Sequence, residues 1–84
     1  MHEANPIDVI ERFIVDTLLK GRSVARSDNL LMSGILDSLA VMSLVAFLED
    51  RFSISIPFDE VLIENFYTLE AIGAYVSIKV SEDD

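Results

Sequence analysis

The stretch that decides the fold is DNLLMSGILDSL, residues 28–39, in which a polar loop leads into the start of a helix. Asp37 is placed to cap a helix that the following apolar pattern predicts from Ser38 to Phe52. Ser38 then lies exposed in the first turn, where unpaired N–H groups and the helix dipole favour an anion such as a phosphate. The sequence therefore predicts a serine that is well placed for covalent attachment of a phosphate-linked cofactor.

The chain before this stretch predicts one helix and one long loop. Asn5 and Pro6 are typical of a helix start, and Gly21 is the expected C-cap. Between them, residues at three- and four-residue spacing form one mostly apolar stripe: Ile7, Ile10, Phe13, Ile14, Thr17 and Leu18. Residues 21–34 are rich in Gly, Ser, Asn and Asp and predict an ordered loop, held to the core by Leu30 and Leu31.

The chain after it predicts the rest of an all-α bundle, with three main helices and one short helix. In the helix that begins at Ser38, five side chains are expected to face inward: Leu39, Met42, Leu44, Leu48 and Phe52. Residues 54–56 predict an extended connector, and residues 58–66 a short helical turn. Residues 81–84 are expected to fray. Thr68 is the expected cap of the last helix, whose buried stripe is Leu69, Ile72, Val76 and Val80.

Size and composition limit the chain to one small domain. With 84 residues we expect a single domain over residues 1–84, with a core from about 6 to 80. The chain is 51% hydrophobic and has no cysteine, so its core needs no disulfide and fits a reducing compartment. Residues 1–6 lack a signal-peptide pattern, and the apolar stretch Leu39–Leu48 is too short to cross a bilayer. We therefore expect a cytoplasmic monomer that does not insert into membranes.

The charge of the chain points to basic partners. The net charge is −9, which argues against binding to nucleic acid or to anionic membranes. Between Ser27 and Ile78 eight acidic residues stand against a single basic one, Arg51. A protein that docks on this segment is expected to be basic, although acidity of this kind also serves solubility alone.

Gly34, two intervening residues and Asp37-Ser38-Leu39 resemble the attachment motif of the acyl carrier and peptidyl carrier protein family. Further similarities to this family follow in the same order and spacing: Leu48-Glu49-Asp50-Arg51-Phe52, Ile56-Pro57, Glu64-Asn65-Phe66 and Thr68-Leu69-Glu70-Ala71-Ile72. The resemblance covers nearly the whole chain. It implies an acyl-carrier-protein-like four-helix bundle.

The resemblance also implies a function. Ser38 corresponds to the attachment site of 4'-phosphopantetheine, which a phosphopantetheinyl transferase loads from coenzyme A, and Asp37 and Leu39 correspond to residues that help the transferase dock. The arm ends in a thiol that holds acyl or aminoacyl groups as thioesters. The expected partners are a ligase that loads the acyl or aminoacyl group and downstream transferases or synthases, which supply the catalytic groups.

The helix after Ser38 suggests where partners dock and which pathway the carrier serves. Ala40, Val41 and Val45 lie off the expected inward stripe and predict a small apolar docking patch, to which we add Glu49. Carriers of fatty acid synthesis commonly have acidic residues at the positions of Ala40 and Ser43. Their replacement favours a dedicated aminoacyl, D-alanyl or secondary-metabolite pathway over general fatty acid synthesis.

Other classes of function have less support. His2 is the only histidine and lies near the N-terminus, so neither a catalytic triad nor a zinc site is expected, and the pair Asp59 and Glu60 is interpreted as solvated surface. The residues after Asp28 lack the ligand spacing of a calcium-binding loop. We therefore expect no enzyme and no metal site. The alternative that the sequence leaves open is a helical interaction module with a carrier-like fold that is never modified.

Overall fold

The computed structural model describes residues 5–83, with side chains through Glu82, and confirms the all-α prediction. Residues 5–83 contain no strand. The helical elements, in chain order, are α1 (Pro6–Phe13), its π-helical continuation η1 (Ile14–Leu18), α2 (Ser38–Phe52), the 3-10 turn η2 (Phe58–Glu60), α3 (Ile63–Phe66) and α4 (Leu69–Asp83).

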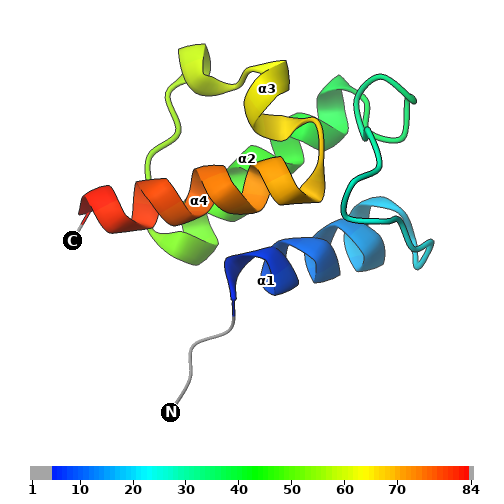
Figure 1. The fold of residues 1–84 in the computed structure, drawn as a ribbon, viewed down its shortest axis with the longest axis horizontal. Coiled ribbons are helices and arrows are strands. Elements are labelled where there is room, and N and C mark those ends of the chain that lie inside the picture. Colours follow the sequence, from blue (N-terminus) through cyan, green and yellow to red (C-terminus); the bar gives the residue numbers. More distant parts are fainter. Residues whose placement is uncertain (1–4, 84) are drawn as a thin grey trace.

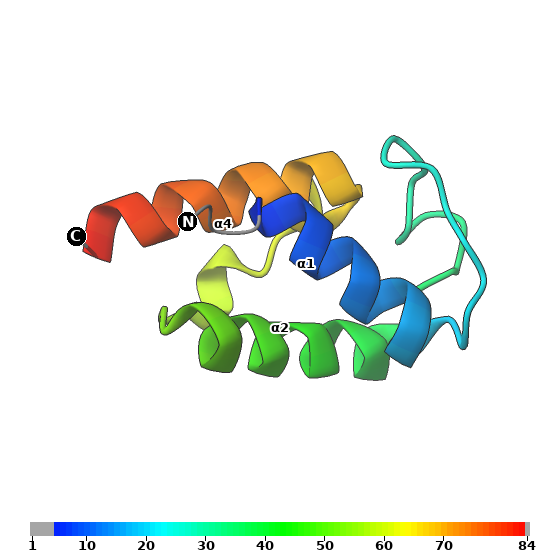
Figure 2. The ribbon, with the colours of Figure 1, turned by 90° about the horizontal axis from the view of Figure 1, so that it is seen from below.

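The three long helical segments enclose one core. Figure 2 shows α4 along one side of the molecule and α2 along the other, with α1 running obliquely between them. The long loop after η1 passes along one end of the bundle and returns to the start of α2, while η2 and α3 bridge α2 and α4 (Figure 1). No helix within residues 5–83 has the length and apolar character needed to cross a membrane.

The predicted helix starts are confirmed by their caps. The Asn5 side chain accepts the N–H of Ile7 at 3.1 Å, with Pro6 as the first helical residue. Before α4 the Thr68 hydroxyl accepts the N–H of Ala71 at 3.0 Å. Each cap satisfies a donor that the helix itself leaves unpaired, which fixes where the helix begins.

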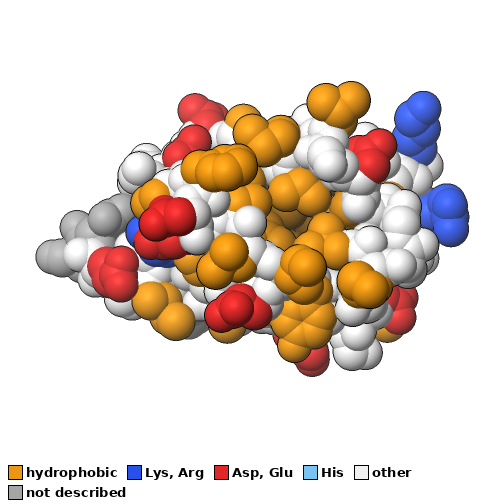
Figure 3. Space-filling model, turned by 90° about the horizontal axis from the view of Figure 1, so that it is seen from above, with side chains coloured by type: hydrophobic (Ala, Val, Ile, Leu, Met, Phe, Trp, Pro, Cys, Tyr) orange, Lys and Arg blue, Asp and Glu red, His pale blue; other side chains and the backbone are white. Residues whose placement is uncertain are grey.

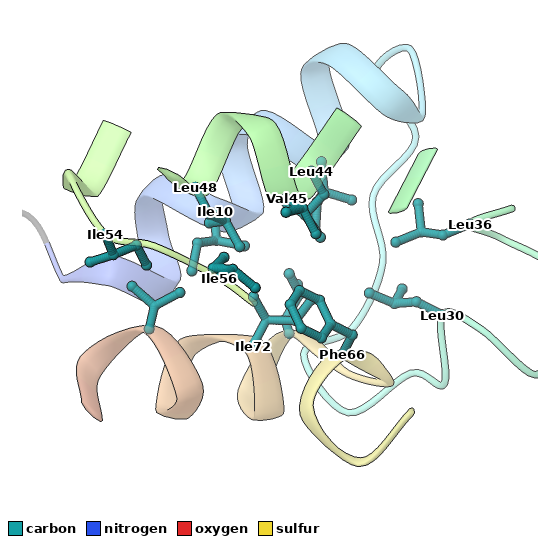
Figure 4. Close-up of a cluster of buried hydrophobic side chains, with 13 residues drawn as sticks. Ile10, Leu30, Leu36, Leu44, Val45, Leu48, Ile54, Ile56, Phe66 and Ile72 are labelled. Atoms are coloured by element: carbon teal, nitrogen blue, oxygen red, sulfur yellow. The ribbon is translucent and has the colours of Figure 1, made fainter. Parts of the chain in front are cut away.

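The core draws on all four α-helices, the long loop and the extended connector, but not on η2 (Figure 4). Its members are fully or nearly fully buried apolar side chains: Ile10, Ile14, Leu30, Leu36, Leu44, Val45, Leu48, Ile54, Ile56, Phe66, Leu69, Ile72 and Val76. Most of the predicted stripes of the first and last helices lie in or against this core, whereas Thr17 is exposed. The extended connector contributes two of these side chains, Ile54 and Ile56, so its alternation serves burial without a sheet.

The predicted inward face of α2 is partly wrong. Leu44 and Leu48 are buried, but Leu39 is 78% exposed and Met42 is 52% exposed. A helix turns by about 100° per residue, so Leu39 lies about 140° and Met42 about 160° around the axis from Leu44. Since ten of the fifteen residues of this helix are apolar, including all of residues 44–48, composition does not reveal its inward face, and the bundle places Val45 there instead.

Close packing of α1 against α4 depends on a glycine. A Cβ atom built on Gly73 would lie 3.1 Å from the Cβ of Ile7, which is closer than side chains normally pack. The absence of a side chain at Gly73 therefore lets the first turn of α1 approach the second turn of α4.

The C-terminal residues depart from the prediction of fraying. Helix α4 continues through Asp83, and its last turns carry an ion pair between Lys79 and Glu82, with 3.9 Å between the charged atoms. This spacing of three residues brings the two side chains to one face of the helix. Asp84 and His2 lie outside the described residues.

Candidate functional site

The loop that leads to Ser38 is anchored at several points. Arg26 donates hydrogen bonds to Asp8 at 2.6 Å and to Glu11 at 2.9 Å, which hold the loop against α1 and raise the pKa of Arg26. Further along, the N–H of Leu30 bonds to the carbonyl of Tyr67 at 2.7 Å, and the Leu30 side chain is buried as predicted. These contacts fix the loop to the rest of the bundle before it reaches α2.

The last turn of the loop is shaped by its own polar groups. The Asn29 side chain accepts the N–H of Met32 at 2.8 Å, and the Ser33 hydroxyl donates to the Asn29 carbonyl at 2.5 Å. Gly34 then takes a φ of +79°, a conformation that side chains disfavour. Leu36 turns into the core and ends the loop, so the next three residues emerge on the surface.

Ser38 is the first residue of α2, and it is exposed. The Asp37 side chain accepts the N–H of Ala40 at 2.8 Å and caps the helix as predicted. The first N–H groups of a helix have no acceptor within the helix, so those of Ser38 and Leu39 remain available beside the hydroxyl. A phosphate on Ser38 would therefore meet free donors and the positive end of a fifteen-residue helix.

A groove of about 530 Å³ opens beside this hydroxyl. It is mainly apolar and is formed by the loop, the first turns of α2 and the segment around η2; its lining residues are Leu31, Gly34, Leu36, Asp37, Ser38, Val41, Met42, Phe58 and Val61. Figure 3 shows the face of the molecule that carries η2 and α3, where apolar side chains surround a hollow. A group attached to Ser38 would thus have an apolar surface within immediate reach.

The predicted site residues fall into two groups. Asp37, Ser38 and Leu39 are consecutive and exposed at the start of α2. Ala40 and Val41 are half-buried and pack against the core. The prediction that Val45 belongs to an exposed patch is wrong, because Val45 is only 8% exposed and lies one residue after Leu44 on the inward face.

Glu49 has a structural contact of its own. Its carboxylate accepts the N–H of Ile56 at 2.8 Å, and its side chain is half-buried. This bond ties the last turns of α2 to the extended connector that follows. A docking role for Glu49 stays a prediction.

The residues on the far side of the groove were not predicted from the sequence. Phe58 is 84% exposed although it is a large aromatic residue, and it lines the groove together with Val61. The sequence did contain a sign that Phe58 is exposed. It follows Pro57 directly and precedes two acidic residues, so it does not belong to the apolar stripe of any predicted helix. Met42, which the apolar spacing predicts to face the core, is exposed and lines the groove instead.

The interpretation of Glu60 as solvated surface also needs correction. Glu60 is half-buried, and its carboxylate accepts hydrogen bonds from the Tyr75 hydroxyl at 2.5 Å and from Lys79 at 3.2 Å. These bonds, that of Tyr75 first, lower the pKa of Glu60, while burial and the bond to Glu60 raise the pKa of Tyr75. The two partners lie four residues apart on α4, a spacing that places them on one face of the helix.

Comparison with known proteins identifies the family to which the chain belongs. The profile of the family described as "Phosphopantetheine attachment site" matches residues 10–76, which is most of the chain. No curated protein matches the sequence. Carrier domains of this family hold a covalently attached 4'-phosphopantetheine, are not themselves catalytic, and interact with phosphopantetheinyl transferases and biosynthetic enzymes. On this match, the chain belongs to the phosphopantetheine-binding family of carrier proteins.

Proposed function

We propose that this chain carries acyl or aminoacyl groups for a dedicated biosynthetic pathway, on an arm attached to Ser38. The observation that carries the assignment is the placement of Ser38 as the first, exposed residue of α2, directly beside an apolar groove. The described side chains fit the arm at this point, because a free hydroxyl, unpaired helix N–H groups and room for an attached group coincide there.

The residues around Ser38 have separable tasks in this proposal. The Ser38 hydroxyl attacks the pantetheine-bearing phosphate of coenzyme A, and a base on the transferase takes its proton. The pyrophosphate bond of coenzyme A breaks, adenosine 3',5'-bisphosphate leaves, and the arm stays on Ser38 as a phosphodiester. The N–H groups at the start of α2 stabilise the charge of the attached phosphate. When bound, the arm supplies a thiol that carries the cargo as a thioester. The catalytic groups for loading and transfer come from partner enzymes.

The partners dock, in this proposal, on the exposed apolar residues that flank Ser38 and the groove, which we call the docking face: Met32, Leu39, Met42, Phe58, Leu62 and Ile63. We assign this face to the enzymes that act on the arm, because any enzyme that reaches Ser38 must contact α2 and the loop beside it. Ala40, Val41 and Glu49 remain candidates at its inner edge, while the burial of Val45 removes it from the set. Acidic residues next to the face, such as Asp37 and Asp59, favour a partner whose apolar centre has basic residues around it.

The choice of pathway rests on the first turns of α2. Exposed Leu39, Met42 and Ser43 give this face few charges, and Ala40 is half-buried. An apolar recognition surface suits dedicated partners better than enzymes that recognise acidic side chains at these positions. Efficient loading and elongation of the carrier by general fatty acid synthase enzymes would contradict this assignment.

The first experiment tests attachment. Purified apo protein is incubated with coenzyme A, magnesium and a promiscuous phosphopantetheinyl transferase, and intact masses are measured for the wild type and for Ser38→Ala. We expect a single phosphopantetheine adduct on the wild type and none on Ser38→Ala. Ser77→Ala, which removes an exposed hydroxyl from α4, is the matched control and should be modified like the wild type.

The outcome separates the two functions that the sequence leaves open. An adduct that persists in Ser38→Ala would place the attachment site elsewhere. No adduct on folded wild-type protein, with a known carrier modified in parallel, would favour the helical interaction module that is never modified.

A further inference from the structure

The wall of the groove opposite α2 has little secondary structure of its own. It consists of Phe58 and Val61, which lie in and just after the three-residue turn η2. Phe58 is too exposed to be held in place by burial, and Val61 is only half-buried. Val61 packs against the core but Phe58 does not, so core packing holds only one end of this wall.

Glu60 is the residue that ties this segment to the bundle. It lies between Phe58 and Val61, and its carboxylate accepts hydrogen bonds from Tyr75 and Lys79 of α4. Its backbone carbonyl also accepts the side-chain N–H of Asn65 at 2.9 Å, so the same residue links η2 to α3. We call Glu60, Tyr75 and Lys79 the α4 latch.

The hydrogen bonds of the α4 latch are strong enough to hold the wall in one position. Hydrogen bonds to a charged group contribute more than bonds between neutral groups. The Tyr75 ring packs near Phe66 in the core, with 5.6 Å between ring centroids, so the donor is itself fixed. The side chain of Lys79 is only 16% exposed and is also paired with Glu82. A fixed pair of donors on α4 thus determines where Glu60, and with it the wall, can lie.

We infer that Glu60 is a positioning residue for the groove, and that the α4 latch determines how closely the wall covers the cargo on the arm. This inference rests on the proposed function. The groove begins at Ser38, and a longer acyl chain has more apolar surface to bury in it than a short one has. A wall held by the latch shields a long cargo, whereas a released wall leaves long and short cargoes equally open to solvent.

The test compares cargo lengths on four proteins: the wild type, Glu60→Gln, Tyr75→Phe and the control Glu64→Gln. Glu64 is an exposed carboxylate on the neighbouring helix α3. Tyr75→Phe removes only the hydroxyl and retains the ring that packs near Phe66. Each protein is loaded with an acetyl or an octanoyl arm from the corresponding coenzyme A thioester. The rate at which hydroxylamine releases each acyl group is then measured by intact mass.

The readout is the ratio of the acetyl to the octanoyl release rate. We expect a ratio well above one for the wild type and for Glu64→Gln, and a ratio closer to one, lower by up to about tenfold, for Glu60→Gln and Tyr75→Phe. Global unfolding would also expose the octanoyl group and lower the ratio, so only variants that are folded under the assay conditions are compared. Thermal unfolding of each variant confirms that it is folded during the assay.

Two results would overturn the inference while the carrier function stands. One is a wild-type ratio of one on correctly loaded protein, which would mean that the groove does not shield cargo. The other is that Glu60→Gln and Tyr75→Phe both give the same acetyl-to-octanoyl ratio as the wild type. Failure of all four proteins to accept any arm would instead contradict the proposed function, and this inference with it.

Discussion

At the scale of single residues, the site depends on the contrast between Asp37 and Ser38. Asp37 uses its side chain to cap α2, while Ser38 follows it and is exposed to solvent. Leu36, one residue earlier, is buried and holds the turn in place. The exposure of Ser38 therefore follows from an anchored residue before it and a capped helix after it.

The cap leads to a prediction for stability. Asp37→Ala removes the acceptor for the N–H of Ala40, and we expect the free energy of unfolding to fall by about 1 kcal/mol, the usual cost of losing an N-cap. Urea unfolding followed by circular dichroism measures this. Asp50→Ala, at the negative end of the same helix, is the control and should cause no such loss. Equal losses in the two variants would show that the capping bond contributes nothing specific.

At the scale of elements, the rotation of α2 about its axis separates core from surface. Leu44, Val45 and Leu48 point into the bundle, and Leu39 and Met42 point out beside the groove. Both sets are apolar, so the same helix supplies core packing on one face and the docking face on another. The function of α2 depends on this rotation as much as on its sequence.

Two substitutions of leucine by alanine test the rotation. Leu44→Ala removes a fully buried side chain and should lower the free energy of unfolding by about 2–5 kcal/mol, whereas Leu39→Ala should change it by about 0.5 kcal/mol or less. Chemical denaturation of both variants gives the two values under identical conditions. A large loss for Leu39→Ala with a small loss for Leu44→Ala would mean that α2 is rotated the other way.

At the scale of the whole molecule, the surface combines strong acidity with a local apolar face. The net charge of −9 repels other polyanions and attracts basic surfaces. The docking face interrupts this charge around Ser38 and the groove. Long-range attraction by the acidic surface and short-range contact on the apolar face are thus available to the same partner.

The docking face predicts a kinetic defect that charge alone does not explain. Met42→Glu places a carboxylate in the face, and we expect kcat/KM for phosphopantetheine attachment to fall by about tenfold, a typical cost of losing one important apolar contact. Ile78→Glu is the control, since it adds the same charge at an exposed apolar residue of α4 that does not line the groove. Mass spectrometry over time gives both rates. A similar loss in the control would assign the effect to net charge.

The sequence alone determined the features that depend on near neighbours in the chain. The caps at Asn5, Asp37 and Thr68 were predictable, because each acts on an N–H group two or three residues away. The start of α2 at Ser38 and the all-α class followed from the same local signals together with apolar spacing. The motif around Ser38 also indicated the family, which the match over residues 10–76 confirms.

Only the tertiary structure decided which apolar residues face inward and which residues line the groove. In α2 ten of the fifteen residues are apolar and five of them are consecutive, residues 44–48, so the orientation of the helix depends on where α1, α4 and the connector present matching surfaces. The groove joins residues 31–42 to Phe58 and Val61, and the latch joins Glu60 to Tyr75 and Lys79, fifteen and nineteen residues further along. Such contacts exist only after the chain has packed, since no helical or turn spacing relates partners that far apart.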